Sequence, residues 1–157
     1  MIIRKAAEPD LPRLMKIEEE CFGWQKFSPE TVKAFVERSD SFALMAVNGR
    51  EILGTALGIM SDQASEGKIA SIAVLRKHRG KGIGAELLVA CETEFQSRSL
   101  RRYSLEVETE NEPAISLYLR KGYEAKGVIR DFYSAGRHAY CMEKKVSSEH
   151  SVQIKPY

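Results

Sequence analysis

Residues 69–88 read IASIAVLRKHRGKGIGAELL and place three kinds of sequence in succession. An apolar run typical of a buried strand comes first, a basic cluster follows, and alternating glycines precede a segment with the apolar spacing of a helix. Glycines let a backbone approach a ligand, and a helix start presents free N–H groups and a positive dipole end. The stretch therefore predicts an anion site, with phosphate as the natural ligand. The glycines are Gly80, Gly82 and Gly84, and the basic cluster is Arg76, Lys77, His78, Arg79 and Lys81.

The glycine spacing separates this loop from two other phosphate loops. A dinucleotide-binding fold has G-x-G-x-x-G, whereas this loop is G-x-G-x-G and lacks a supporting βαβ pattern with an acidic residue in the right place. A nucleotide-hydrolysing loop has G-x-x-x-x-G-K followed by Ser or Thr, which is absent here. Glycines that merely form a tight turn are the remaining alternative, and they leave the basic cluster unexplained.

The composition indicates one globular domain. The chain has 157 residues, 43% of them hydrophobic and 29% charged, with a formal net charge of +2. That charge is too small for a general nucleic-acid binder. The longest apolar run, residues 42–47, is too short to cross a bilayer, and the N-terminus MIIRKAAEPD does not resemble a signal peptide, so we expect a cytoplasmic protein. Cys21, Cys91 and Cys141 are odd in number and never form a C-x-x-C pair, which predicts free thiols and no metal site.

The apolar periodicity predicts a mixed α/β fold over residues 1–146, followed by a polar tail at 147–157. Asp10 is the expected N-cap of the first helix, and Asn48-Gly49 the expected turn of a hairpin. The strand around Glu106 alternates so that this carboxylate lies on the face opposite the apolar one. The expected strands are 2–3, 41–47, 51–60, 69–75, 103–107, 123–133 and 138–146, and the expected helices begin near 11, 29, 82 and 113.

The pattern Arg79-x-x-Gly82-x-Gly84 after SIAV resembles the acetyl-coenzyme A loop of the GNAT acetyltransferase superfamily, Q/R-x-x-G-x-G/A. The resemblance implies a central, mostly antiparallel twisted sheet of about six to seven strands flanked by about four helices. It also implies acetyl-CoA as the donor, whose pantetheine arm would lie along β-strand residues like an added strand. The implied cofactor residues are Ile72, Ala73 and Val74 for that arm, and the backbone amides of Arg79, Gly80, Lys81, Gly82, Ile83 and Gly84 for the pyrophosphate.

The segment LEVETENEPAISLYLRKGY, residues 105–123, is similar to L-E-V-R-x-x-N-x-x-A-I-x-L-Y-x-x-x-G-F of the ribosomal-protein-alanine and archaeal protein N-terminal acetyltransferases. This similarity implies acetylation of the α-amine of protein or peptide N-termini. It makes Glu106 the general base, Asn111 a ligand of the cofactor arm, and Tyr118 both a cofactor contact and the acid that protonates the thiolate. From the residues alone, Glu106 could be a solvent-facing carboxylate, Asn111 a helix cap and Tyr118 a core aromatic.

Two aromatic-rich segments, CFGWQKF at 21–27 and RDFYSAGRHAY at 130–140, resemble the peptide-binding loops of the N-terminal acetyltransferases. The family's last hairpin often reads Y-x-x-G-E-D-A-Y, so Arg137 and His138 replace acids, while Glu108 replaces the arginine of L-E-V-R. We expect the change to basic residues in the hairpin to give more tolerance for acidic residues near the substrate's N-terminus. The implied peptide contacts are Phe22, Trp24, Tyr133 and Tyr140.

Other functions remain open at the level of sequence. A lysine or small-molecule acetyltransferase of the same fold is one alternative, and a non-catalytic acyl-CoA sensor is another. His78 and His138 are poor candidates for a base, because one lies among cations and the other in a strand. The sequence does not say whether the chain pairs with an auxiliary subunit or forms a homodimer.

Overall fold

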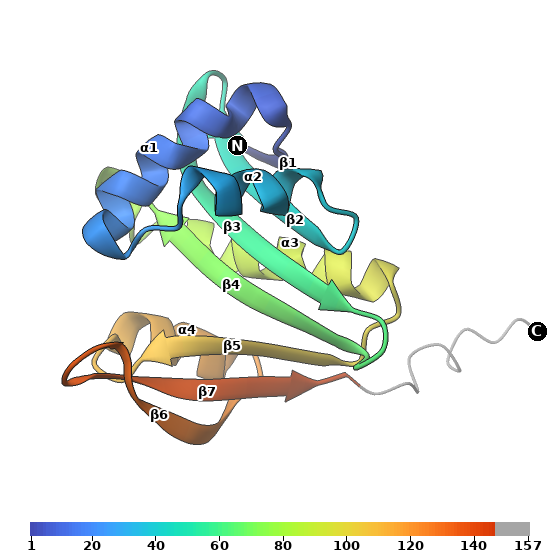
Figure 1. The fold of residues 1–157 in the computed structure, drawn as a ribbon, viewed down its shortest axis with the longest axis vertical. Coiled ribbons are helices and arrows are strands. Elements are labelled where there is room, and N and C mark those ends of the chain that lie inside the picture. The colour runs from blue at the N-terminus through green and yellow to red at the C-terminus, as the bar shows by residue number, and fades with distance from the viewer. Residues whose placement is uncertain (147–157) are drawn as a thin grey trace, which may run out of the picture.

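The computed structural model describes residues 1–146, so the predicted polar tail at 147–157 lies outside the described residues. Its centre is one sheet in the order β1-β2-β3-β4-β5-β7-β6 (Figure 1). Every neighbouring pair is antiparallel except β4 and β5, which run parallel. The predicted mostly antiparallel sheet is thereby confirmed. The strands are β1 (Ile2–Lys5), β2 (Ser41–Asn48), β3 (Glu51–Ser61), β4 (Glu66–Val74), β5 (Arg102–Glu108), β6 (Glu124–Ser134) and β7 (Arg137–Lys145).

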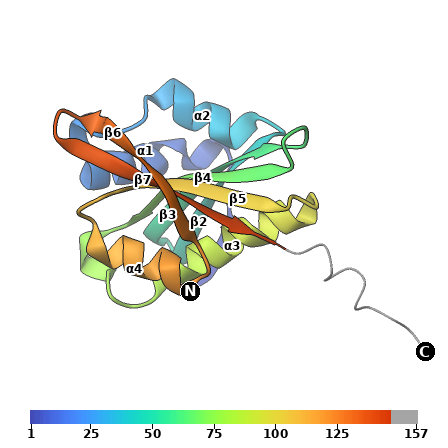
Figure 2. The same cartoon turned by 90° about the horizontal axis from the view of Figure 1, so that it is seen from below.

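Helices cover both faces of this sheet, as Figure 2 shows. Helices α1 (Leu11–Phe22) and α2 (Pro29–Glu37) lie on one face, over the strands from β2 to β4. Helices α3 (Ile83–Ser97) and α4 (Glu112–Arg120) lie on the other face. Four α-helices and seven strands in the described part of the chain confirm the predicted mixed α/β class.

The two faces carry separate apolar cores, because successive side chains of a strand point to opposite sides. In β2, Phe42 and Leu44 join the core beneath α3, whereas Ala43 and Met45 join the core beneath α1 and α2. The helix predicted from residue 82, α3, also turns its apolar side chains to a core. Its apolar stripe is fully buried as predicted, and it consists of Ile83, Leu87, Cys91 and Phe95.

The parallel strands β4 and β5 pair over only four residues each. Their register runs from Glu66 opposite Arg102 to Ile69 opposite Leu105 and then stops. Beyond that point β4 pairs with β3 alone and β5 with β7 alone, and Figure 1 shows the two strands moving apart. A register shift at Leu57 and Gly58 of β3 faces the same part of β4. We call this region the β4–β5 divergence, and its strand edges have unpaired backbone groups toward each other.

Local details differ from the sequence predictions at two turns. The first hairpin turns at residues 49–50, one position later than predicted, and only Gly49 has a positive φ, of 61°. Strand β4 begins at Glu66 rather than at residue 69. Gly67 permits this early start because a Cβ there would lie 2.4 Å from the ring of Phe95. A glycine in a polar stretch predicts a loop, whereas Gly67 provides close packing within a strand.

Asp10 also differs from its predicted role. It occupies the N-cap position of α1, but its side chain makes no capping hydrogen bond. The carboxylate instead accepts two bonds from Arg4, of 2.9 and 3.0 Å, and one from the amide of Ala7, of 2.9 Å. The Arg4 guanidinium is the main reason that the pKa of Asp10 is lowered to about 2. Asp10 thus ties β1 to the start of α1.

The described residues contain no helix with the length and apolarity needed to span a membrane. The three cysteines are free, as predicted, although only Cys91 is fully buried.

Candidate active site

The glycine loop leads directly into α3, and its backbone conformation requires glycine at two positions. Gly80 and Gly82 have φ values of +77° and +82°, in the left-handed region that disfavours other residues. Nothing lies within 4 Å of a Cβ at either position, so backbone conformation rather than crowding selects glycine there. Gly84 has an ordinary φ, and a Cβ would meet its neighbours only at 3.8 and 3.9 Å.

The amides of this loop are available to a ligand. The amide of Arg79 donates to the carbonyl of Arg76 at 3.3 Å. The next amide along the chain that donates to a backbone carbonyl is that of Glu86, which bonds to Gly82 at 3.1 Å. Within residues 1–146, the amides of residues 80–84 therefore have no backbone acceptor. Free amides at the start of a 15-residue helix are well suited to bind phosphate oxygens.

The basic cluster is divided in its partners. Nζ of Lys77 and Nε2 of His78 each lie 3.1 Å from Oε2 of Glu51. Arg79 donates from Nε to the carbonyl of Val74 at 2.8 Å and so ties the loop to the end of β4. In the described part of the chain, only Arg76 and Lys81 of the cluster have neither an ion pair nor a side-chain hydrogen bond. The loop therefore offers mainly backbone donors, supported by these two cations.

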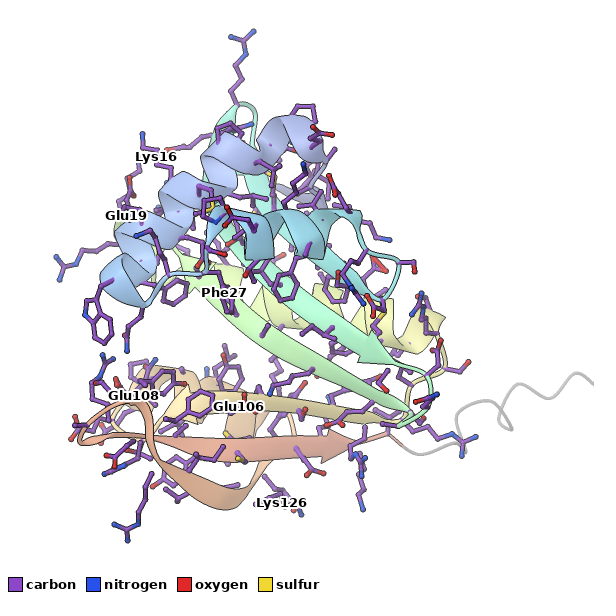
Figure 3. The ribbon with its side chains drawn as sticks, in the orientation of Figure 1. Lys16, Glu19, Phe27, Glu106, Glu108 and Lys126 are labelled. Atoms are coloured by element: carbon purple, nitrogen blue, oxygen red, sulfur yellow. The ribbon has the colours of Figure 1, made fainter. Side chains whose placement is uncertain are left out.

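Glu106 lies on β5 at the β4–β5 divergence. Its neighbours Leu105 and Val107 face the core beneath α3, so its side chain points to the α1 and α2 side, as predicted from the alternation. Figure 3 shows Glu106 beside Glu108 on β5, with Phe27 on the side of α1 and α2. The carboxylate is 16% exposed and forms an ion pair with Lys68, whose Nζ lies 2.7 Å from Oε1. The sequence analysis missed Lys68, although period-two alternation within β4 would have placed it on this polar face.

Two tyrosines from different elements are candidates for the proton donor. Tyr118 of α4 is buried, and burial is the main cause that raises its pKa to about 12, with smaller contributions from Cys91 and Tyr133. Burial, together with smaller contributions from the carboxylates of Glu106 and Glu108, likewise raises the pKa of Tyr133 to about 12. Both phenols therefore keep their protons near neutral pH. A buried neutral phenol can donate a proton to a departing anion.

The other predicted site residues are distributed unevenly. Asn111 caps α4, because its Oδ1 accepts from the amide of Ala114 at 3.3 Å, which is the alternative that the sequence left open. Phe22 packs against the core beneath α1 and α2, whereas Trp24 is 74% exposed. Tyr140 pairs in register with Val107 and packs toward α3 and α4. It therefore lies on the sheet face opposite Glu106, away from the other candidate peptide contacts.

Glu108 and Arg137 form a two-fold hydrogen-bonded ion pair. Nε of Arg137 lies 2.6 Å from Oε2 of Glu108, and Nη2 lies 3.1 Å from Oε1. Nη1 donates to Gln25 at 2.8 Å, and Gln25 donates in turn to the carbonyl of Tyr133 at 3.3 Å. We call this the Glu108–Arg137–Gln25 network. It joins β5 and the tip of the β6–β7 hairpin to the segment between α1 and α2.

The network changes the meaning of two departures from the family pattern. Glu108 stands where the pattern has arginine, and Arg137 stands where the hairpin pattern has glutamate, so the charges have exchanged places. His138 is also engaged, because its Nδ1 accepts from the amide of Asp131 at 2.9 Å. The expected attraction of Arg137 and His138 for acidic substrates is therefore not supported, since both side chains have partners within the protein.

Comparison with known proteins agrees with this fold. Residues 11–123 match the acetyltransferase (GNAT) family, and the chain belongs to this family. An uncharacterized N-acetyltransferase of Methanocaldococcus jannaschii is 32% identical over 146 residues, which cover 92% of each chain. An N-alpha-acetyltransferase of Sulfurisphaera tokodaii is 38% identical over 78 residues, or 49% of this chain and 47% of that protein. The ribosomal-protein-S18-alanine N-acetyltransferase of Escherichia coli shares the fold, with a TM-score of 0.83 at 22% identity over 93% of this chain and 94% of that one.

Membership identifies the protein as an acetyltransferase that uses acetyl-CoA. The residues present fit this donor. The free amides at the start of α3 suit its pyrophosphate, and the unpaired edge of β4 suits an extended arm with amide groups.

Proposed function

We propose that this protein transfers an acetyl group from acetyl-CoA to the α-amine at the N-terminus of a protein or peptide. The observation that carries the proposal is the β4–β5 divergence, with Glu106 on the α1 and α2 face of β5 and the buried Tyr118 of α4 in the core on the α3 face. The Sulfurisphaera N-alpha-acetyltransferase supports it, because its similarity to this chain reaches 38% in the matched segment.

In this proposal the loop and β4 hold the donor. The free amides of residues 80–84 take the pyrophosphate, and Ile72, Ala73 and Val74 line the pantetheine arm. The amide of Arg79, also expected there from the sequence, is bonded to the carbonyl of Arg76 instead. Asn111, in addition to capping α4, has an amide group that can donate to the same arm. The donor supplies a thioester carbonyl and a thiolate leaving group.

Glu106 takes the proton that the amine must lose, and Tyr118 supplies the proton that the sulfur gains. A peptide α-amine with a pKa of about 7.8 is roughly 10% neutral at pH 7, whereas a lysine amine near about 10.4 is below about 0.1% neutral. A carboxylate is an adequate base for the α-amine. A backbone N–H near Val74 is the proposed donor to the developing oxyanion.

Direct transfer needs no cysteine nucleophile. Cys21 is the thiol nearest to the end of β4, with Sγ 3.9 Å from the carbonyl of Val74. Burial raises its pKa, which keeps it as an unreactive thiol. Turnover in a Cys21→Ala protein would accord with direct attack by the amine.

The Glu108–Arg137–Gln25 network bears on the acceptor. It fixes the β6–β7 hairpin beside the segment that carries Phe22 and Trp24, and Tyr133 lies in the same hairpin. We propose that these three aromatics contact an extended peptide N-terminus. A flexible chain end can enter between two tethered loops more readily than a lysine on a folded surface.

A peptide panel tests the function. Peptides beginning with Ser, Ala or Met should become acetylated on the α-amine, as measured by mass spectrometry, while the same peptides with blocked N-termini and an internal lysine should not. Glu106→Gln and Tyr118→Phe should each lower kcat by about 100-fold. Acetylation of polyamines or free amino acids alone would favour the small-molecule alternative. Tight acetyl-CoA binding without turnover on any amine would favour the sensor.

A further inference from the structure

The open face of β5 carries two carboxylates, Glu106 and Glu108, two residues apart. Neighbours at this spacing lie on one face of a strand, and like charges there repel each other. Each carboxylate has a cation of its own from another strand. Arg137 of β7 binds Glu108, and Lys68 of β4 binds Glu106. The family pattern has an arginine at position 108, so this chain replaces a nearby positive charge with a negative one and supplies a separate cation to Glu106.

Lys68 reaches Glu106 because of the strand register. Lys68 lies opposite Ser104 in the parallel β4–β5 pair, one residue before that pairing ends at Ile69 and Leu105. Glu106 is the next residue of β5, just past the last paired position. The 2.7 Å contact therefore joins the last paired part of β4 to the first part of β5 within the divergence.

The two oxygens of Glu106 have different surroundings. Oε1 forms the ion pair with Lys68, whereas Oε2 has no side-chain partner among residues 1–146. A carboxylate held at one oxygen keeps the other free to accept a proton. Lys68 is 44% exposed and Glu106 only 16% exposed, so the pair lies at the edge of the site with its carboxylate turned inward.

We propose that Lys68 is a positioning residue for acetyl transfer, which holds Oε1 of Glu106 so that Oε2 faces the acceptor amine. This inference rests on the proposed role of Glu106 as the base. Lys68 also offsets the repulsion that Glu108 exerts on Glu106. It acts through the carboxylate and does not itself touch the reacting atoms.

Replacement of Lys68 by methionine tests this role, because it removes the charge and keeps most of the length of the side chain. We expect kcat for acetylation of a peptide substrate to fall by about tenfold, a smaller loss than for removal of the base itself. The KM for acetyl-CoA and the melting temperature should stay close to those of the wild type. Lys68→Arg should recover most of kcat, because arginine keeps a cation within reach of Glu106.

A double-mutant cycle shows whether Lys68 acts through Glu106. In a Glu106→Gln background, Lys68→Met should cause little further loss of kcat. The matched control is Lys126→Met, which removes another strand lysine whose Nζ lies 3.0 Å from Glu124, on the outer strand β6. This control should keep wild-type kinetics.

Three results would overturn the inference. Unchanged kcat in Lys68→Met would show that Glu106 needs no such partner, and an equal fractional loss in the Glu106→Gln background would show that Lys68 acts independently. Either result would leave the N-terminal acetyltransferase function intact. A wild-type protein that acetylates no peptide would remove the proposed function and the role of Lys68 together.

Discussion

Glu108 and Arg137 pair in the reverse order of charge from the family pattern, through contacts of 2.6 and 3.1 Å. Two departures that look independent in sequence are therefore one compensated exchange. The pair spans β5 and β7 and holds the hairpin tip, so its effect should fall on substrate binding rather than on the acetyl donor.

Exchange of both residues should restore what each single change removes. Glu108→Arg places two guanidinium groups together and Arg137→Glu places two carboxylates together, so each should raise the KM for peptide and lower the melting temperature. The double variant should recover most of both losses, because the two charges can pair again in the opposite order. Thermal unfolding and peptide KM measure both effects, and purely additive losses would contradict this exchange.

The loop before α3 offers a matched pair of glycine substitutions. Gly82→Ala forces a side chain into a φ of +82° and should destabilise the loop by about 1–2 kcal/mol, which should weaken acetyl-CoA binding at least about tenfold. Gly84→Ala keeps an ordinary φ and meets only normal contacts, so binding should be nearly unchanged. Calorimetric titration with acetyl-CoA distinguishes the two, and equal losses would mean that backbone conformation is not what the loop requires.

Local pattern was sufficient to predict the elements and the position of the donor loop. The four-residue spacing from Ile83 to Phe95 and the alternation around Glu106 each depend on neighbours close in sequence. The partners of the site residues depend on strand pairing instead. Lys68 meets Glu106 across 38 residues (106 minus 68), because β4 and β5 are parallel neighbours of fixed register. No local pattern specifies that register.

The same limit applies to the buried network behind the site. The hydroxyl of Tyr123 donates to Glu92 at 2.7 Å, and Lys144 lies 3.0 Å from the same carboxylate. In sequence Glu92 is a polar residue within an amphipathic helix, which indicates a solvated face. Only the packing of α3 against β7 shows that this carboxylate is buried and compensated.

Tyr118 should act as an acid over a wide pH range. Its pKa of about 12 keeps the phenol protonated to well above pH 10, so its deprotonation should not reduce kcat between pH 7 and pH 10. Tyr118→Phe should lower kcat by about 100-fold throughout that range. Tyr103→Phe is the control, because Tyr103 is another buried tyrosine of the same core but lies where β4 and β5 are still paired, away from the divergence. A fall in the kcat of the wild type between pH 7 and pH 10 would indicate that a group other than Tyr118 titrates there.

Asp10 should make stability depend on acid. Its folded pKa of about 2 is below the ordinary value, so its contribution is complete above about pH 4 and is lost as the pH falls through about 2. Asp10→Asn should lower the free energy of unfolding at pH 7 by about 1–2 kcal/mol, a range reduced for the exposure of Arg4. Urea unfolding at pH 7 and pH 2 measures this difference. An equal loss at both pH values would assign the effect to packing.

Glu18 should behave in the opposite way. It is 3% exposed on α1, and its Oε1 accepts from the amide of Phe27 at 2.9 Å, where the α1–α2 segment turns. Burial raises its pKa, which the Phe27 amide only partly offsets. A folded pKa above the unfolded one stabilises the protein at low pH, and that contribution is lost as the pH rises through the folded value.

Glu18→Gln should therefore raise the melting temperature at pH 7–8 by about 2–4 °C, because glutamine keeps an acceptor for the Phe27 amide and carries no charge. The gain should shrink toward pH 4, where Glu18 is protonated in both states. Glu19→Gln is the control on the same helix, because Glu19 is exposed and its ion pair within residues 1–146 is with Lys26, at 3.0 Å. A Glu18→Gln protein that melts lower than the wild type at pH 8 would show that ionised Glu18 is needed to hold the segment that carries Phe22 and Trp24.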